Sequence, residues 1–233
     1  QPNGKIVVGG AIGVFDPNGV ATRVDYIARL NADGTLDTSF NHGGLDAIAS
    51  ALAIQRDGKI VVAGYVDYFD LAGLDEKVGH ILRLNTDGTL DTTFNHGGLN
   101  SDVYALAFRS DGKIVVGGTF TSFNPDGTSD VRHRLAQLNA DGSLDTGFAP
   151  DLNSDVYAIA QQCAGGIIVG GDSNTLDSTT INKIARIFGP PALCTLPSTG
   201  SDPSPLLWFG ASVLLIGVAA VGTSRRRRIA RSV

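Results

Sequence analysis

A repeat with a period of 54 residues constrains this chain more than any other feature of its sequence. The segment GKIVV occurs at residues 4–8, 58–62 and 112–116. The segment LNxDGxLD occurs at residues 30–37, 84–91 and 138–145. A weaker fourth copy begins with GGIIV at residues 165–169. Because two separate segments keep one period, the sequence predicts an array of one supersecondary unit.

Each unit is expected to form four short antiparallel strands. In the third copy, apolar and alternating residues predict strands at 103–108, 113–120, 132–139 and 143–148. Glycine-containing turns separate these strands, and a polar loop covers residues 121–131. Blade repeats of β-propellers have similar periods, of about 40–50 residues. The sequence therefore predicts an all-β fold, a fragment of a propeller with four-stranded blades, followed by one C-terminal transmembrane helix.

The motifs DGKIVVGG and RLNxDGxLDxxF resemble the delta-60 repeat family, a β-propeller repeat of bacterial surface and secreted proteins. The resemblance covers residues 1 to about 188. The third copy departs from it at Gln137, where the other copies have Arg29 and Arg83, and again at Pro150. The resemblance implies the fold and leaves the function open.

The repeats divide the body into a partial blade, two full blades and a second partial blade. Their predicted bounds are 1–46, 47–101, 102–154 and 155–188. Two full and two partial blades are fewer than the four to eight complete blades of a closed propeller. We therefore expect further blades upstream, preceded by a signal peptide. In the alternative, the two partial blades complete each other in a small ring.

The C-terminal segment predicts a membrane anchor. Residues 206–223 are uncharged, and a helix of this length spans about 27 Å, enough to cross a bilayer core. Trp208 lies near its outer end. Four arginines follow: Arg225, Arg226, Arg227 and Arg228. Because such a block stays cytoplasmic, the N-terminus is expected outside and residues 224–233 inside. The alternative is a buried core helix with a solvated basic end.

A sorting motif lies in the linker, residues 189–205. Its residues are Leu196, Pro197, Ser198, Thr199 and Gly200. Together with the apolar span and the arginines, it resembles the LPxTG signal of Gram-positive surface proteins. The resemblance implies that a sortase cleaves between Thr199 and Gly200 through a thioacyl intermediate. Thr199 would then be bonded covalently to peptidoglycan, and the protein would be located at the cell wall.

The charge distribution argues against nucleic acid as a partner. The chain has a net charge of −5, and residues 200–233 alone carry +4, which leaves −9 on the body. An acidic body lacks the basic stripe of a nucleic-acid groove. The sequence also contains no nucleophile elbow, zinc-protease motif, phosphate loop or dinucleotide fingerprint. We therefore expect no catalytic residues in this chain.

Two sets of residues are candidate ligands. Asn31, Asp33 and Asp37 carry oxygen atoms at alternating positions, as in calcium loops, but the glycine and glutamate of an EF-hand are not at their required places. A hairpin turn stabilised by Asx hydrogen bonds is the favoured interpretation. His42 and His96 lie one period apart. They could act as metal ligands or form a pH-sensitive rim. The favoured interpretation is that both histidines lie in loops between blades. We expect no cofactor in this protein.

Neither the other two histidines nor the two cysteines are expected to form a ligand site. His80 and His133 do not share a repeat position, which indicates ordinary strand residues. Cys163 and Cys194 could form a disulfide in an extracellular protein and fix the linker to the last blade.

Together these features predict a wall-anchored surface protein whose propeller binds an unknown extracellular ligand. Residues 15–22, 68–78 and 123–131 vary while the strands repeat, which suits a binding rim on a rigid scaffold. Two alternatives stay open. One is a wall-bound or membrane-tethered hydrolase or lyase with its site in upstream blades, and the other is a structural spacer.

Overall fold

The computed structural model describes residues 1–15, 22–40, 44–71, 74–95, 98–123, 130–162 and 165–187. The chain divides into two compact units, Gln1–Thr199 and Gly200–Val233, and the second lies wholly outside the described residues. All regular structure in the described part is β-strand. Among these residues, no helix has the length and apolar character needed to cross a bilayer. The predicted span, residues 206–223, lies outside them.

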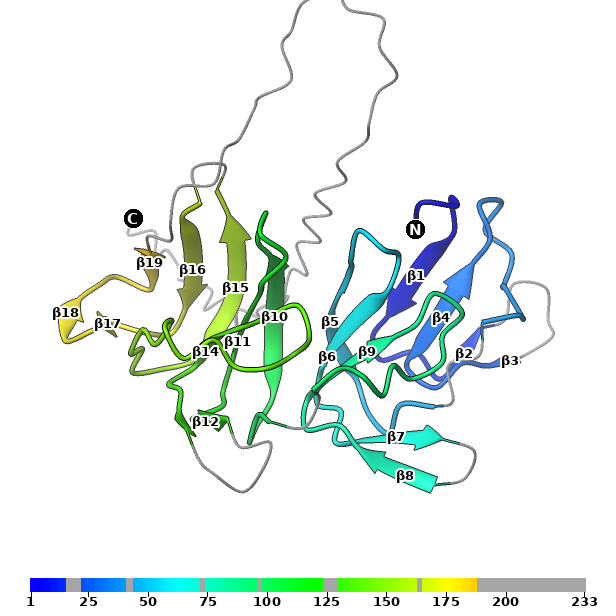
Figure 1. Ribbon diagram of the computed structural model, residues 1–233, viewed down its shortest axis with the longest axis horizontal. Helices are drawn as coiled ribbons and strands as arrows, with labels where there is room; N and C mark the ends of the chain where they lie inside the picture. The colour runs from blue at the N-terminus through cyan, green and yellow to red at the C-terminus, as the bar shows by residue number, and fades with distance from the viewer. Residues whose placement is uncertain are drawn as a thin grey trace, which may run out of the picture. The chain divides into compact units, whose positions relative to one another are not determined.

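Four copies of an antiparallel sheet follow one another along the chain, and we call them repeats 1 to 4 (Figure 1). Repeat 1 pairs β1 (Ile6–Gly9) with β4 (Ile27–Leu30). Repeat 2 has the order β5 (Ala49–Ile54), β6 (Ile60–Gly64), β9 (Ile81–Leu84). Repeat 3 has β10 (Val103–Phe108), β11 (Ile114–Gly118), β14 (Leu135–Leu138). Repeat 4 has β15 (Val156–Gln161), β16 (Ile167–Gly171), β19 (Ile184–Ile187). We refer to the members of each three-stranded sheet as its first, second and third strands, and β1 and β4 of repeat 1 correspond to the second and third.

A small hairpin connects the second and third strands of every repeat. The hairpins are β2 (Val14–Phe15) with β3 (Thr22–Arg23), β7 (Tyr68–Leu71) with β8 (Leu74–Lys77), β12 (Ser122–Phe123) with β13 (Asp130–Val131), and β17 (Thr175–Leu176) with β18 (Thr179–Thr180). The polar loop predicted at residues 121–131 is therefore partly strand. Leu99 forms a bridge to Phe123 of its hairpin, and Phe123 is 1% exposed, so the hairpin is tied to the core.

The fourth strand of the predicted blade is absent from repeat 3. Residues 143–148 form one isolated bridge, Leu138 to Leu144, and then turn. Asp145 explains the turn. Its side-chain Oδ1 accepts the backbone N–H of Gly147, and its backbone carbonyl oxygen accepts the N–H of Phe148. Repeats 2 and 3 are thus three strands with a short bridged extension, formed by Leu84 with Leu90 and by Leu138 with Leu144, and the four-stranded prediction is wrong in this respect.

Neighbouring sheets pack face to face and share their cores. Three clusters of buried apolar side chains each combine one face of a sheet with the opposite face of the next. Ile27 of repeat 1 packs with Ile60 of repeat 2, and Ile81 of repeat 2 packs with Val103 and Ile114 of repeat 3. The near-continuous apolar character of the second strands follows, since these strands are covered on both faces.

Equivalent positions at the two ends of the array are exposed. Ile184 in repeat 4 is 61% exposed, whereas Leu135 and Ile81, at the same position of repeats 3 and 2, are 0% exposed. Ile6 in repeat 1 is 50% exposed, whereas Ile60 is 0% exposed. The burial of an apolar residue in this array therefore depends on whether another repeat covers its face.

An arginine links repeat 2 to repeat 3. Arg83 Nε lies 2.7 Å from Asp91 Oδ2, and the guanidinium lies over the ring of Phe94, 4.7 Å from its centroid. Its Nη1 donates to the carbonyl oxygen of Ala140 at 2.7 Å. Lys59 Nζ contacts the same Asp91 oxygen at 2.6 Å. Repeat 1 makes the same set of contacts with Arg29, Asp37, Phe40, Thr86 and Lys5. In repeat 3, Gln137 replaces the arginine and donates to Asp145 at 2.6 Å.

Candidate functional site

A β-bulge at the start of the first strand distinguishes one end of the sheets. The pairing of the first and second strands shifts by one residue in repeats 2, 3 and 4, and the extra residues are Ser50, Tyr104 and Tyr157. A Cβ on Gly118, opposite the bulge of repeat 3, would lie 2.0 Å from the carbonyl oxygen of Asp102. Glycine is therefore required there, and the bulge redirects the tyrosine side chain.

Three tyrosines form a continuous row across repeats 2, 3 and 4, which we call the tyrosine row. The ring of Tyr104 lies between those of Tyr65 and Tyr157, with centroid distances of 5.9 Å and 5.6 Å. The ring planes are inclined by 46° and 31°. Tyr65 is 44% exposed and Tyr157 is 48% exposed. The row therefore presents aromatic surface to solvent on a backbone that the bulges hold in place.

The residue before each third strand has a left-handed backbone conformation. The φ angles are 68° for Tyr26, 68° for His80, 67° for Arg134 and 64° for Lys183. Such values are uncommon for residues other than glycine and are maintained only where surrounding contacts fix them. Here the fixing contact is a hydrogen bond to the carbonyl of this residue, donated by Gly10, Gly64, Gly118 and Gly171 respectively. In repeats 2, 3 and 4 the glycine that ends the second strand thus positions a variable side chain at the bulge end.

These variable side chains contact carboxylates beside the tyrosine row. His80 lies between two of them, with Nε2 3.2 Å from Asp67 Oδ1 and Nδ1 3.3 Å from Asp102 Oδ1. Arg134 Nε lies 3.7 Å from Asp155 Oδ1. Asp102 and Asp155 lie two residues before Tyr104 and Tyr157 in the sequence. Charged groups of neighbouring repeats therefore meet along the row.

The hydroxyl of Tyr157 joins this network. It donates to Asp172 Oδ2 at 2.9 Å, and Lys183 Nζ lies 3.0 Å from Asp172 Oδ1. The hydrogen bond to Asp172 raises the pKa of Tyr157, and the contact with Lys183 lowers the pKa of Asp172. Burial, with the neighbouring Tyr65, raises the pKa of Tyr104. The two tyrosines of the first strands thus carry protonated hydroxyls at neutral pH.

Burial also acts on a carboxylate of the row. It raises the pKa of Asp102, against the lowering effect of His80 and together with the negative charge of Asp67. The arrangement brings aromatic faces, carboxylates and hydroxyl donors onto one surface. Such a surface can bind a ligand by stacking, hydrogen bonds and charge.

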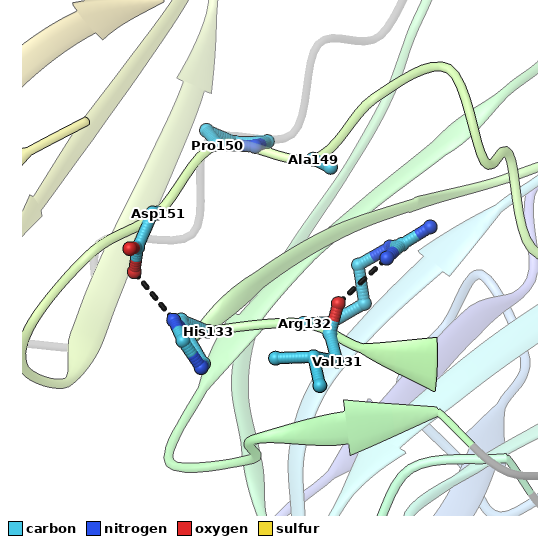
Figure 2. Close-up of a pocket in the computed structure, with 6 residues that line it drawn as sticks. All are labelled: Val131, Arg132, His133, Ala149, Pro150 and Asp151. Carbon is cyan, nitrogen blue, oxygen red and sulfur yellow. Dashed lines mark hydrogen bonds and ion pairs between the residues drawn. The ribbon is translucent and has the colours of Figure 1, made fainter. Parts of the chain in front are cut away.

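A small cavity lies elsewhere, between residues that precede the third strand of repeat 3 and residues that lead to repeat 4. Figure 2 shows its lining residues, Val131, Arg132, His133, Ala149, Pro150 and Asp151. Its volume is about 200 Å³, below the roughly 300–1,000 Å³ of small-molecule sites. The side chains of His133 and Asp151, which form a hydrogen bond, are 42% and 60% exposed. This open and small cavity is a weaker candidate than the tyrosine row.

A family match agrees with the sheets and their order. The family described as a domain of unknown function (DUF5122), a β-propeller, matches residues 1–40, 55–94 and 109–148. This chain belongs to the DUF5122 β-propeller family. The matched segments contain the second and third strands of repeats 1, 2 and 3, with the Lys–Asp contacts. Tyr104 and Tyr157 lie outside the matched segments.

One curated relative of this DUF5122 chain is the periodic tryptophan protein 2 homolog of Neurospora crassa, which is similar over 109 residues at 35% identity. The similarity covers 44% of this chain, and the chain spans only 10% of that relative.

The structure places the candidate calcium ligands of the DUF5122 repeat in hydrogen bonds of the chain. Asp33 Oδ1 accepts the backbone N–H of Thr35 at 3.0 Å, and Asn31 Nδ2 donates to the Thr35 hydroxyl at 2.9 Å. Asp37 instead contacts Arg29 and Lys5. Within the described ranges, no group of three or more His, Cys, Asp and Glu residues is placed to hold a metal ion. Calcium binding by these residues stays a prediction without support from the geometry.

Several other predicted sites lie outside the described residues. They are His42, His96, Cys163, Cys194, the sorting motif at residues 196–200, and Arg225, Arg226, Arg227 and Arg228. The tips of the three variable loops lie outside as well, at residues 16–21, 72–73 and 124–129.

The interpretation of His80 and His133 as ordinary strand residues is wrong. Both precede third strands, and His80 has the same repeat position as Arg134, 54 residues later. The tyrosine row was also missed, although a signal exists. The segment SDVYA occurs at residues 101–105 and 154–158, so an acid and a tyrosine recur together. What the sequence does not indicate is that Tyr65, which follows a second strand, completes the row.

Proposed function

We propose that this chain is part of a cell-wall-anchored surface protein whose propeller repeats bind an extracellular ligand. Binding is proposed to take place along Tyr65, Tyr104 and Tyr157. The observation that carries the binding role is the tyrosine row, whose rings are partly exposed and lie with centroid distances of 5.9 Å and 5.6 Å. The sorting motif, the apolar span and the arginines of the sequence support the anchoring role.

Rigid tyrosines are well suited to binding. Tyrosine supplies a large contact area and a hydroxyl group at a small cost in conformational entropy, and it is enriched in binding hot spots. In this chain the rings of Tyr65 and Tyr104 lie on sheets whose second strands are fully buried. The bulge at Tyr104 is fixed by its close approach to Gly118. The rings are therefore preorganised, so that binding requires little ordering of the protein.

The anchoring role is tested on purified cell walls. After digestion of the peptidoglycan, mass spectrometry of the C-terminal peptide of the protein should show an end at Thr199 that carries a cross-bridge amine. A peptide that continues past Gly200 into residues 206–223 would contradict wall anchoring. The same experiment with Thr199→Ala in the motif is the control, and this variant should not become bonded to the wall.

A further inference from the structure

The surroundings of the tyrosine row indicate the charge of its ligand. Aromatic faces carry a negative potential that attracts cations, and the attraction is strongest where carboxylates reinforce it. The carboxylates beside the row are Asp67, Asp102, Asp155 and Asp172. The permanent cations in contact with them are Arg134 and Lys183. The row and its immediate surroundings are therefore negative in sum.

The positions of the cations leave one part of the row more negative than the rest. Arg134 contacts Asp155, and Lys183 contacts Asp172. Asp67 and Asp102 share the single ring of His80, which can offset at most one of their two negative charges. These two carboxylates lie at the end of the row formed by Tyr65 and Tyr104. A cationic group is thus expected to bind most strongly over this end.

The spacing of the rings indicates the form of the ligand. Successive centroids are 5.9 Å and 5.6 Å apart. In an extended peptide, side chains on one face repeat every two residues, or about 6.6 Å. Alternate residues of such a peptide would therefore meet successive rings of the row.

We propose that the tyrosine row binds an extended peptide that presents lysine or arginine side chains at alternate positions. This inference deepens the proposed binding function and rests on it. Each cationic group lies over or between tyrosine rings, and the carboxylates beside the row pair with the charge. The hydroxyl of Tyr157 already donates to Asp172, which leaves its oxygen to accept a backbone N–H of the peptide.

Binding of two matched peptides to the full chain in non-ionic detergent tests the proposal. The first peptide has lysine at alternate positions, and the second is identical except that every lysine is acetylated, which removes the charge. Isothermal titration calorimetry should detect binding of the first peptide, weakened by added salt, and little or no binding of the second. Equal binding of both peptides would overturn the cationic ligand.

Variants of two equally exposed tyrosines locate the site. Tyr65 in the row and Tyr68 in β7 are 44% and 43% exposed. Tyr65→Ala should raise the Kd of the lysine peptide about threefold to thirtyfold, the effect of one lost cation–π contact. Tyr65→Phe should keep most of the affinity, because the ring remains. Tyr68→Ala should leave the Kd unchanged, and equal losses in both alanine variants would refute the placement.

A neutral oligosaccharide separates this inference from the proposed function. If it binds the full chain, and Tyr65→Ala but not Tyr68→Ala weakens that binding, the row is a ligand site and the peptide assignment is wrong. If neither the peptides nor the oligosaccharide respond to Tyr65→Ala, the row has no binding role and the proposed function fails with it.

Discussion

Replacement of Arg83 by glutamine should measure what holds neighbouring repeats together. The third repeat already carries this substitution at Gln137, whose amide holds Asp145 at 2.6 Å. Arg83→Gln should therefore keep the contact with Asp91 and lose the contacts that only the guanidinium makes. The two strongest of those are the hydrogen bond to the carbonyl of Ala140 at 2.7 Å and the stacking over Phe94 at 4.7 Å, and a longer hydrogen bond to Gln55 Oε1 at 3.3 Å is lost with them.

The expected loss follows from these two contacts. A hydrogen bond from a charged donor contributes about 1.5–3 kcal/mol, and a desolvated cation–π contact contributes about 0.5–2 kcal/mol. We therefore expect Arg83→Gln to lower the free energy of unfolding by about 2–5 kcal/mol. Arg83→Ala should cost more than Arg83→Gln, because the contact from residue 83 to the buried carboxylate of Asp91 is lost as well and Lys59 remains as its cation.

Urea unfolding of the full chain in detergent, followed by far-ultraviolet circular dichroism, measures both variants. Arg23→Gln is the control, because Arg23 also contacts an aspartate through Nε but its side chain is 83% exposed. It should unfold at the same urea concentration as the parent protein. If Arg83→Gln also unfolds there, the contacts from Arg83 to repeat 3 do not stabilise the array, and the reasoning is refuted.

Three further predictions concern burial, backbone and pH. Leu135→Asp should lower the free energy of unfolding by more than about 3 kcal/mol, while Ile184→Asp at the same repeat position should change it by about 0.5 kcal/mol or less, since the residues are 0% and 61% exposed. Equal effects in urea unfolding would mean that the face of repeat 4 is covered. Gly118→Ala should cost about 1–3 kcal/mol and weaken ligand binding at Tyr104, because its Cβ would lie 2.0 Å from the Asp102 carbonyl oxygen. Gly13→Ala, with nothing within 4 Å of the added Cβ, should be neutral, and similar melting temperatures for the two variants would exclude the steric argument. Hydrogen bonds from Lys5 and Lys113, respectively, lower the pKa of Asp37 and Asp145. Their contribution to stability should thus be complete above about pH 4 and decline as the pH falls below it. Asp145→Asn should flatten the acid limb of a plot of stability against pH, and an unchanged limb would contradict the assignment.

Much of the fold could be predicted from local patterns. The first strand of repeat 3 was predicted at residues 103–108, where β10 lies. The second strand was predicted at residues 113–120 and the third at residues 132–139, and β11 and β14 are shorter versions of them. These predictions succeed because alternation and turn residues act over a few neighbouring residues. The prediction of a fourth strand at residues 143–148 is wrong because the side chain of Asp145 turns the chain there: it accepts the backbone N–H of Gly147.

The sequence by itself determined the repeat, the three main strands of a unit, and the family to which the chain belongs. These are properties of residues close together in the chain, where turns and strand patterns are encoded. Only the tertiary structure decided which isoleucine is buried, since Ile81 and Ile184 have the same repeat position and differ only in what covers them. It alone also decided that Tyr65, Tyr104 and Tyr157 form one row. The three rings come from different sheets, and their distances depend on how those sheets stack, which no single repeat specifies.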